Sequence, residues 1–354
     1  MKWRKPVRRL LASTFTFTFA LTLAVTVVAA VAEPVRQRLE IAWPTPNKGW
    51  EQGLSFNEFI QPTAAGEPES GCFGCVRSHG MQFHEGIDIK AVARDRRGEP
   101  TDEVFAAMAG VVRHVSDRAG DSNYGRYIVL EHPEATPAVY TLYAHLARVL
   151  PGIADGVRVE RGQAIAIMGH TKSGTPIPRE RAHLHFEIGV MVTREFQSWY
   201  ERRGYGSPNE HGLWNGFNLM GFDPLDFYDQ WRDHKVDNLQ DYFGQMKPQV
   251  TLRIATHKVP DFVQRYPSLV RAPMPEGLLG GWEIQFDWTG IPISWRPLST
   301  MEVAGQTGDL VTILNVDQTS VAQHRAKVLV RRRGAGYIPV RDLETVLQQL
   351  FGIR

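Results

Sequence analysis

The chain has 354 residues, with 40 Lys and Arg against 38 Asp and Glu, which gives a formal net charge of +2. Five of the basic residues and no acidic residue lie in the first 32 positions, so the remaining chain has 35 basic against 38 acidic residues, a net charge of −3. This balance excludes the broad basic surface with which proteins bind nucleic acids. The run Arg331-Arg332-Arg333 indicates a turn or the end of a strand rather than a phosphate clamp.

Residues 1–32 have the organisation of a secretory signal peptide. A basic segment at residues 1–9 is followed by an apolar run at residues 10–30 and by the small residues Ala30-Val31-Ala32. Threonines and a serine lower the hydrophobicity of the run and favour cleavage, although a run of about 20 residues also fits an uncleaved membrane anchor. We therefore expect an exported protein of the periplasm or cell envelope, with membrane attachment only if the leader is retained.

Residues 33–79 are rich in glycine, proline and polar residues and predict an irregular lead-in segment. This segment carries both cysteines of the chain, Cys72 and Cys75, in a Cys-x-x-Cys motif. No second cysteine pair is available to complete a four-cysteine zinc site, and export favours oxidation. A structural disulfide is therefore the favoured interpretation.

Residues 83–190 alternate between short β-branched runs and turn signals. The runs predict strands at 111–115, 127–130, 139–143 and 164–168. Short strands with this punctuation predict a mainly β domain, an antiparallel sandwich or a barrel-like sheet. Two loops at 117–124 and 170–181 are rich in glycine, serine, proline or charge, as binding loops on a rigid scaffold often are.

Three short motifs within this region supply the residue types of a zinc site. They are His84-Glu85-Gly86-Ile87-Asp88, Tyr143-Ala144-His145-Leu146 and His183-Leu184-His185-Phe186-Glu187. Catalytic zinc takes three protein ligands and keeps one position open for water, so these motifs offer three ligands and two further imidazoles. Alternate side chains of a strand share a face, so His183 and His185 can reach one site, and Gly86 lets the chain bend between His84 and Asp88.

The same motifs resemble those of the lysostaphin-type (LytM-type) zinc metalloendopeptidases. The resemblance extends over about residues 80–230 and includes, in order, 106–112, 125–132, 157–163, 169–174 and the closing Phe222-Asp223-Pro224. It implies a peptidase domain at 80–235 with a compact β-sheet core, and a bound Zn²⁺ in a groove. The implied zinc ligands are His84, Asp88 and His185, and the implied catalytic imidazoles are His145 and His183.

This resemblance also implies the chemistry. Zinc lowers the pKa of its bound water to about 7 and polarises the scissile carbonyl. One imidazole takes a proton from the water and the other donates one, with the assignment between His145 and His183 left open. Strand parity turns Glu85 away from the site, whereas Glu187 shares the parity of His185. For Glu187 a solvated edge carboxylate is favoured over a role in orienting a ligand. A reduced thiolate of Cys72 or Cys75 on the open zinc position is a further hypothesis, for a latent enzyme.

The implied substrate is the peptide stems of bacterial peptidoglycan, cleaved at their cross-links. Bridges between D-alanine and diaminopimelate are favoured over oligoglycine bridges, because the leader is of a periplasmic kind and no Gram-positive wall-binding module is recognisable. Two alternatives stay open: a non-catalytic regulator of other cell-wall hydrolases, and a peptidase acting on another extracellular protein. The presence of all five metal and catalytic residues favours catalysis.

The chain continues with an aromatic insert at 193–220 and a C-terminal part at 240–354. In the insert we expect a helix at 193–203, with Thr193 as its N-cap and Gly204 at its end. Packing of its aromatic rings onto the sheet is favoured over a role as a groove wall. The C-terminal part predicts strands at 250–255, 281–288 and 327–331 and a helix at 343–351, which makes a smaller α+β domain. Binding to the cell wall, docking of a protein partner and structural support are all open as its role.

Overall fold

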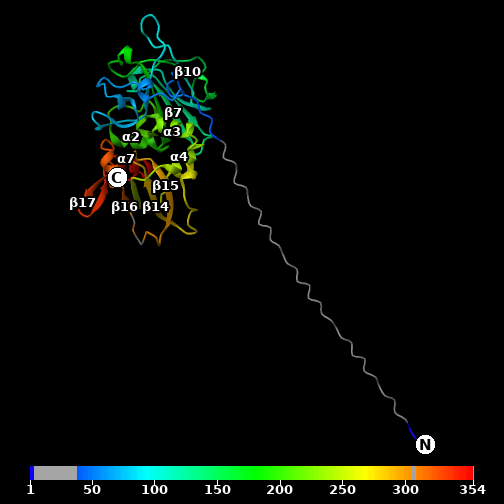
Figure 1. Cartoon of the computed structure of the whole chain (residues 1–354). Coiled ribbons are helices and arrows are strands. Elements are labelled where there is room, and N and C mark those ends of the chain that lie inside the picture. Colours follow the sequence, from blue (N-terminus) through cyan, green and yellow to red (C-terminus); the bar gives the residue numbers. More distant parts are fainter. Residues whose placement is uncertain (4–37, 304–305, 307, 354) are drawn as a thin grey trace. The chain divides into compact units, whose positions relative to one another are not determined.

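The computed structural model describes residues 1–3, 38–303, 306 and 308–353. The predicted signal peptide therefore lies almost entirely outside the described residues. The described residues from 38 onward form one compact unit, and some of its elements are labelled in Figure 1. None of the helices in the described part of the chain is both long and apolar enough to cross a membrane.

A seven-stranded antiparallel sheet carries the candidate site. Its strand order is β12-β11-β7-β6-β5-β9, and β3 pairs with the other end of β11. The strands are β3 (Ile87–Lys90), β5 (Gly110–Ser116), β6 (Tyr127–His132), β7 (Val139–Ala144), β9 (Arg158–Val159), β11 (His183–Met191) and β12 (Leu219–Phe222). All nine residues of β11 are buried, as expected of a strand covered on both faces. The predicted antiparallel β class is confirmed, and in the described residues the sheets are open rather than closed into a barrel.

Two smaller sheets flank the first. One has the order β4-β10-β8, formed by β4 (Glu103–Phe105), β10 (Ala164–Met168) and β8 (Leu146–Val149). The other is a hairpin of β1 (Gly74–Arg77) and β2 (Gln82–His84). His145 alone separates β7 from β8, so at this residue the chain passes from the large sheet to the three-stranded one.

The lead-in segment is packed rather than loose. The rings of Trp43 and Trp50 stack with their centroids 5.1 Å apart, and Tyr228 meets both edge-on. The Tyr228 hydroxyl also donates to the carbonyl of Ala42, at 2.7 Å. Only one short α-helix, α1 (Phe56–Phe59), occurs among the described residues of this segment. The segment therefore contributes to the hydrophobic core beneath the large sheet.

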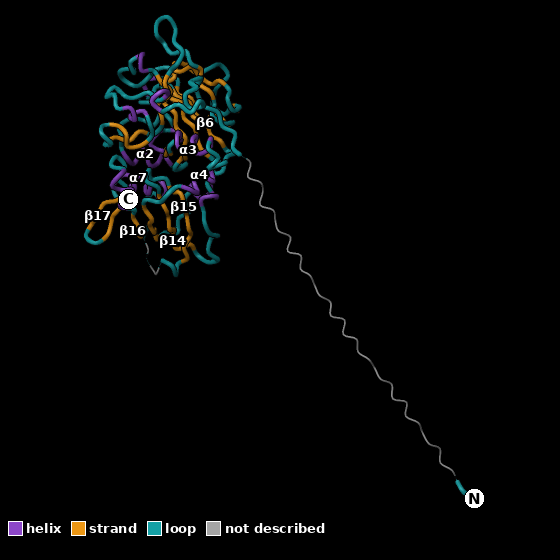
Figure 2. Tube along the Cα trace, in the orientation of Figure 1, coloured by secondary structure: helices purple, strands orange, loops and turns teal. Residues whose placement is uncertain are grey.

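Four helices lie between the large sheet and the C-terminal strands (Figure 2). They are α2 (Phe196–Arg203), α3 (Pro224–Arg232), α4 (Leu239–Gln245) and α7 (Arg341–Phe351). Gly204 ends α2 in the left-handed conformation, as predicted. The predicted start of α2 is wrong: Thr193 accepts from the backbone N–H of Glu195 and donates to Asp261, so the helix begins only at Phe196.

The C-terminal part is an α+β arrangement, as predicted. Its sheet has the order β15-β14-β13-β16, and a separate hairpin pairs β17 with β18. The elements are β13 (Val250–Ala255), α5 (Asp261–Arg265), β14 (Leu279–Phe286), β15 (Pro292–Ser299), β16 (Leu310–Val316), α6 (Gln318–Gln323), β17 (Val330–Arg333) and β18 (Gly336–Pro339). One hydrophobic core contains residues of both the large sheet and the C-terminal part.

Polar contacts join the C-terminal part to the end of β11. The hydroxyl of Tyr266 accepts from the backbone N–H of Met191 at 3.0 Å, and Arg265 donates to the carbonyls of Met191 and Val192, both at 2.9 Å. On another side, Trp288 packs edge-on against Phe73 and Phe83, beside the hairpin that ends at His84. The C-terminal part thus supports two elements that carry site residues.

We expect Tyr266→Phe to lower the free energy of unfolding by about 1–3 kcal/mol, because the buried N–H of Met191 loses its acceptor. Tyr337→Phe is the control, since the Tyr337 hydroxyl has no hydrogen bond to the described residues. Urea denaturation followed by tryptophan fluorescence should show one shifted transition for Tyr266→Phe. Two separate transitions, with the variant affecting only one, would contradict a shared core.

Candidate metal centre

Strand register brings the predicted site residues together. Asp88 on β3 lies directly opposite His185 on β11, and His185 lies opposite Ala144, the last residue of β7. The next residue after Ala144 is His145, which is therefore delivered beside His185. His84 ends β2, and the chain bends through Glu85 and Gly86 into β3.

Gly86 is needed for space as well as for the bend. A Cβ at this position would lie 2.3 Å from the carbonyl oxygen of Phe186 and 2.9 Å from Cγ of Glu187. Any larger residue would push β3 away from β11. The glycine thus allows the close approach on which the alignment of His84 and Asp88 with His185 depends.

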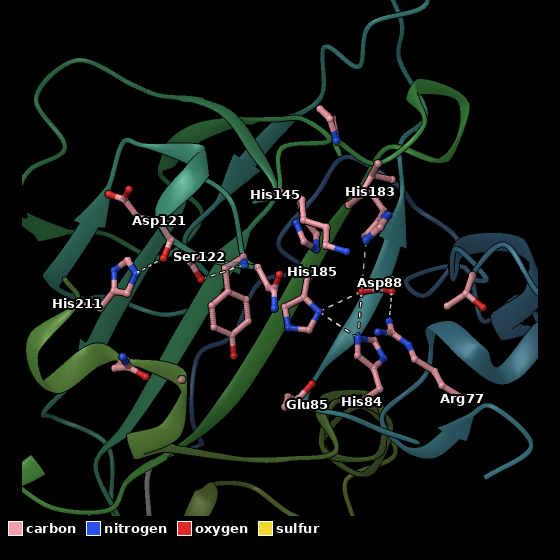
Figure 3. Close-up of a pocket in the computed structure, with 18 of the residues that line it drawn as sticks. Arg77, His84, Glu85, Asp88, Asp121, Ser122, His145, His183, His185 and His211 are labelled. Carbon is pink, nitrogen blue, oxygen red and sulfur yellow. Dashed lines mark hydrogen bonds and ion pairs between the residues drawn. The ribbon is translucent and has the colours of Figure 1, made fainter. Parts of the chain in front are cut away.

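Three ligand atoms form a small triangle at this point (Figure 3). His84 Nε2 lies 3.0 Å from His185 Nδ1 and 3.2 Å from Asp88 Oδ1, and His185 Nδ1 lies 3.1 Å from Asp88 Oδ1. All three residues are buried. Among the described residues they are a group that could hold a metal ion.

Hydrogen bonds on the far side of each ring decide which nitrogen faces the triangle. His84 Nδ1 lies 2.7 Å from the carbonyl of Cys72, which can only accept, so Nδ1 carries the proton. His185 Nε2 lies 2.9 Å from Glu187 Oε1 and donates to it in the same way. In the neutral rings, the lone pairs of His84 Nε2 and His185 Nδ1 therefore both point toward Asp88.

The triangle fits a zinc ion. Ligand atoms about 2.0–2.1 Å from a tetrahedral ion lie roughly 3.3 Å from one another, close to the spacing found here. In this buried space, two nitrogen lone pairs and a carboxylate oxygen face one another. These electron-rich atoms repel one another unless a positive charge, such as a metal ion or a proton, lies among them. Burial lowers the pKa of His185, but its hydrogen bonds to Asp88 and Glu187 outweigh this and raise the pKa to about 9. Burial likewise raises the pKa of Asp88, but the neighbouring His84 and His183 hold it well below its usual range.

The second oxygen of Asp88 is occupied by an arginine. Arg77 Nη2 donates to Asp88 Oδ2 at 2.6 Å, and Arg77 Nε donates to the carbonyl of Ser70 at 2.9 Å. Asp88 is therefore left with one oxygen, Oδ1, directed at the triangle. Arg77 was not singled out from the sequence, because only the pairing of β1 with β2 brings it beside Asp88.

His145 and His183 stand next to the triangle with their ring centroids 5.0 Å apart. The Nδ1 of His145 donates to the carbonyl of Thr171, and that of His183 to the carbonyl of Arg181, both at 2.8 Å. Burial lowers the pKa of both rings, which are therefore neutral at pH 7 with Nε2 as an acceptor. His145 has a φ of 62°, an uncommon conformation for a residue with a side chain and one that recurs at active sites.

Glu187 is not the solvated edge carboxylate that was favoured from the sequence. Its exposed fraction is 1%, and it accepts hydrogen bonds from His185 Nε2, Tyr124 Oη and Tyr140 Oη at 2.9, 2.6 and 2.8 Å. Strand parity had already placed it on the face of His185. Its two tyrosine partners had no signal in the sequence.

The predicted disulfide is also absent, since Cys72 and Cys75 are free thiols in the structure. Cys72 instead contributes its carbonyl, which holds His84. Burial raises the pKa of the Cys72 thiol to about 12, so the thiol is protonated in the metal-free chain. The group of described residues that could hold a metal, His84, Asp88 and His185, does not include Cys72 or Cys75.

The triangle lies in a groove with a volume of about 930 Å³. The groove is lined by parts of both predicted binding loops, at 121–124 and 172–178, and by the insert at 207–217. Within the insert, Phe196 and Trp199 are buried, as favoured from the sequence, whereas Phe217 is 56% exposed and faces the groove. The insert thus serves both packing and the groove wall.

Comparisons with known proteins agree with this site. Residues 82–195 match the model of peptidase family M23. This segment contains His84, Asp88, His145, His183 and His185, so the chain carries a domain of the lysostaphin-type family of metallopeptidases. A search of the curated proteins finds no match.

Several solved structures are similar over part of the chain. A zinc-containing peptidase from Vibrio cholerae is 25% identical, with a TM-score of 0.28, over 43% of this chain and 36% of its own length. The catalytic domain of lysostaphin from Staphylococcus simulans is 18% identical, with a TM-score of 0.28, over 45% of this chain and 87% of that domain. The chain thus spans about a third of the Vibrio cholerae protein.

We expect Arg77→Met to destabilise the metal-free protein by about 2–3 kcal/mol, because the buried Asp88 loses its partner in an ion pair. Arg77 is 23% exposed, so solvent screening keeps the loss below that of a fully buried pair. The control is Arg113→Met, which removes an exposed ion pair with Glu131 worth less than about 1 kcal/mol. Urea denaturation in the presence of a chelator measures both, and equal losses would contradict a special role for Arg77.

Proposed function

We propose that the protein is an exported zinc metalloendopeptidase that hydrolyses peptide cross-links of bacterial peptidoglycan, namely the bridges between D-alanine and diaminopimelate. The observation that carries the proposal is the triangle of His84, Asp88 and His185 beside two neutral imidazoles. The match to peptidase family M23 supports hydrolysis of a peptide bond. The basic and apolar leader supports export.

His84, Asp88 and His185 would hold the zinc ion. When bound, zinc lowers the pKa of a coordinated water to about 7 and polarises the carbonyl of the scissile bond. Because Nδ1 of His145 and of His183 is committed to a backbone carbonyl, only Nε2 of each ring is free to move a proton.

The Nε2 atoms of His145 and His183 would carry out the proton transfers of the reaction. One Nε2 accepts a proton from the attacking water while a C–O bond forms at the scissile carbon. The C–N bond then breaks, and a proton from an imidazolium N–H is transferred to the leaving amine. The lowered pKa keeps both rings neutral before the reaction, so that Nε2 has a lone pair for the proton, and it makes the imidazolium a stronger acid that releases the proton readily.

The groove has room for more than the two residues that flank one bond. Its volume of about 930 Å³ is near the upper end of the range of small-molecule sites, and His84, Asp88 and His185 are among the residues that line it. Basic side chains of Lys172 and Arg181 and acidic side chains of Glu85 and Glu210 line it. This mixed charge suits peptide stems, which carry both free carboxylates and free amines.

The first test combines metal analysis with digestion. Purified residues 33–354 should contain about one zinc per chain and should convert cross-linked muropeptide dimers of diaminopimelate-type sacculi into monomers, as measured by mass spectrometry. A chelator should stop the reaction and added zinc should restore it, because bound zinc would lower the pKa of the attacking water and polarise the scissile carbonyl. Zinc without any change in the muropeptides would reject the proposed substrate.

His145 and His185 should differ in what their loss removes. His185→Ala leaves two protein ligands and should abolish zinc binding. His145→Ala should keep the metal and lose about 10²–10⁴-fold in turnover, as expected for a general acid–base group. The control is His79→Ala, since this side chain is 93% exposed. A His145→Ala variant that lacks zinc, or one that is fully active, would contradict this division of roles.

A further inference from the structure

We infer that Glu187, held by the hydroxyls of Tyr124 and Tyr140, is a positioning residue that fixes the orientation of His185 toward the metal and ties it to the wall of the groove. The inference rests on the proposed function, because it concerns the metal site of that enzyme. It assigns roles to three residues outside the set of predicted ligands and catalytic imidazoles.

Both oxygens of Glu187 are committed. Oε1 accepts from His185 Nε2 at 2.9 Å and from Tyr124 at 2.6 Å, and Oε2 accepts from Tyr140 at 2.8 Å. Glu187, Tyr140 and His185 are buried. A buried carboxylate with three donors has no freedom to turn, so its hydrogen bond fixes both the angle of the His185 ring and the proton on Nε2.

The fixed proton has a direct consequence for the metal. With Nε2 protonated, the lone pair of His185 is on Nδ1, which points at His84 and Asp88. A carboxylate that accepts from a ligand imidazole also makes the ring a stronger donor to a metal.

Tyr124 connects this pair to the groove. Its backbone carbonyl accepts from the N–H of His145 at 2.9 Å, while its hydroxyl holds Glu187. Its ring packs closely on the insert, since a Cβ at Gly216 would lie 3.0 Å from Cε2 of Tyr124. The neighbouring carbonyl of Phe217 accepts from Gln349 of α7 at 2.7 Å. Contacts therefore run without a break from the C-terminal helix, through the groove wall, to a metal ligand.

The test measures zinc affinity and kinetics for Glu187→Gln, Tyr124→Phe and Tyr140→Phe. The matched control is Tyr127→Phe: Tyr127 is fully buried, its ring centroid lies 5.2 Å from that of Tyr124, and its hydroxyl donates to the carbonyl of Trp214 instead of to Glu187. Affinity is measured by competition with a chromogenic zinc chelator on residues 33–354. Unfolding of the metal-free proteins is recorded in parallel.

We expect Glu187→Gln to raise the zinc dissociation constant about 10–100-fold. Tyr124→Phe and Tyr140→Phe should raise it less, and Tyr127→Phe should leave it unchanged. In zinc-saturated protein, kcat should fall while KM changes little, because the substrate does not contact Glu187. A purely structural role would instead lower the stability of the metal-free variants and leave the dissociation constant unchanged.

The inference is overturned if Glu187→Gln binds zinc as tightly as the parent chain, or if Tyr124→Phe and Tyr127→Phe have equal effects. If Glu187→Gln does not fold, the comparison of those two tyrosine variants decides alone. Failure of the proposed function has a different signature, because the parent chain would then bind zinc and leave sacculi intact while the ranking of zinc affinities is still measurable. A parent chain that binds no zinc would overturn both.

Discussion

The buried carboxylate of Asp88 is the interaction on which the rest of the site depends. Its Oδ1 lies 3.1–3.5 Å from nitrogens of His84, His183 and His185, and its Oδ2 accepts from Arg77. A buried charge is costly unless it is fully paired. The fold must therefore bring β3, β11 and the β1–β2 hairpin to one point before this carboxylate is tolerated. In doing so it assembles the candidate metal site.

The candidate site also depends on the register of the strands, because a shift in pairing would separate its residues. A slip of one residue between β3 and β11 would place Leu184 or Phe186 opposite Asp88 instead of His185, and Asp88 would then face a residue whose side chain belongs to the other side of the sheet. Register is maintained by close contacts at positions that accept only glycine, as Gly86 and Gly189 do: a Cβ at either would lie within 2.3 Å of a carbonyl oxygen. The C-terminal part adds hydrogen bonds to the far end of β11, at Met191 and Val192.

Local patterns of the sequence were enough for several of the strands and for the metal motifs, whereas β15 and β16 were not predicted and the strand predicted at 327–331 lies at Val330–Arg333. Residues 164–168 and 250–255 were predicted with the bounds that the structure has, because β-branched runs are set off there by clear breaks. The hydrogen bonds that hold Glu187 could not be predicted from local patterns. Glu187 is 63 residues from Tyr124 and 47 from Tyr140, and hydrogen bonds over such separations follow only from the folded sheet. From its polarity alone, Glu187 was expected to be exposed to solvent. In the structure it is buried, and three hydrogen-bond donors compensate for the loss of solvent.

The position of Tyr124 means that the two halves of the proposed chemistry are not independent. Its carbonyl anchors the backbone of His145, and its hydroxyl anchors the carboxylate that orients His185. A displacement of this one residue would therefore change the distance between the proton-transferring imidazole and the metal, without altering any ligand. Because Tyr124 also lines the groove beside Gly216, a substrate that presses on this wall would act directly on the geometry of the proposed catalysis. Specificity and rate would then depend on the same loop.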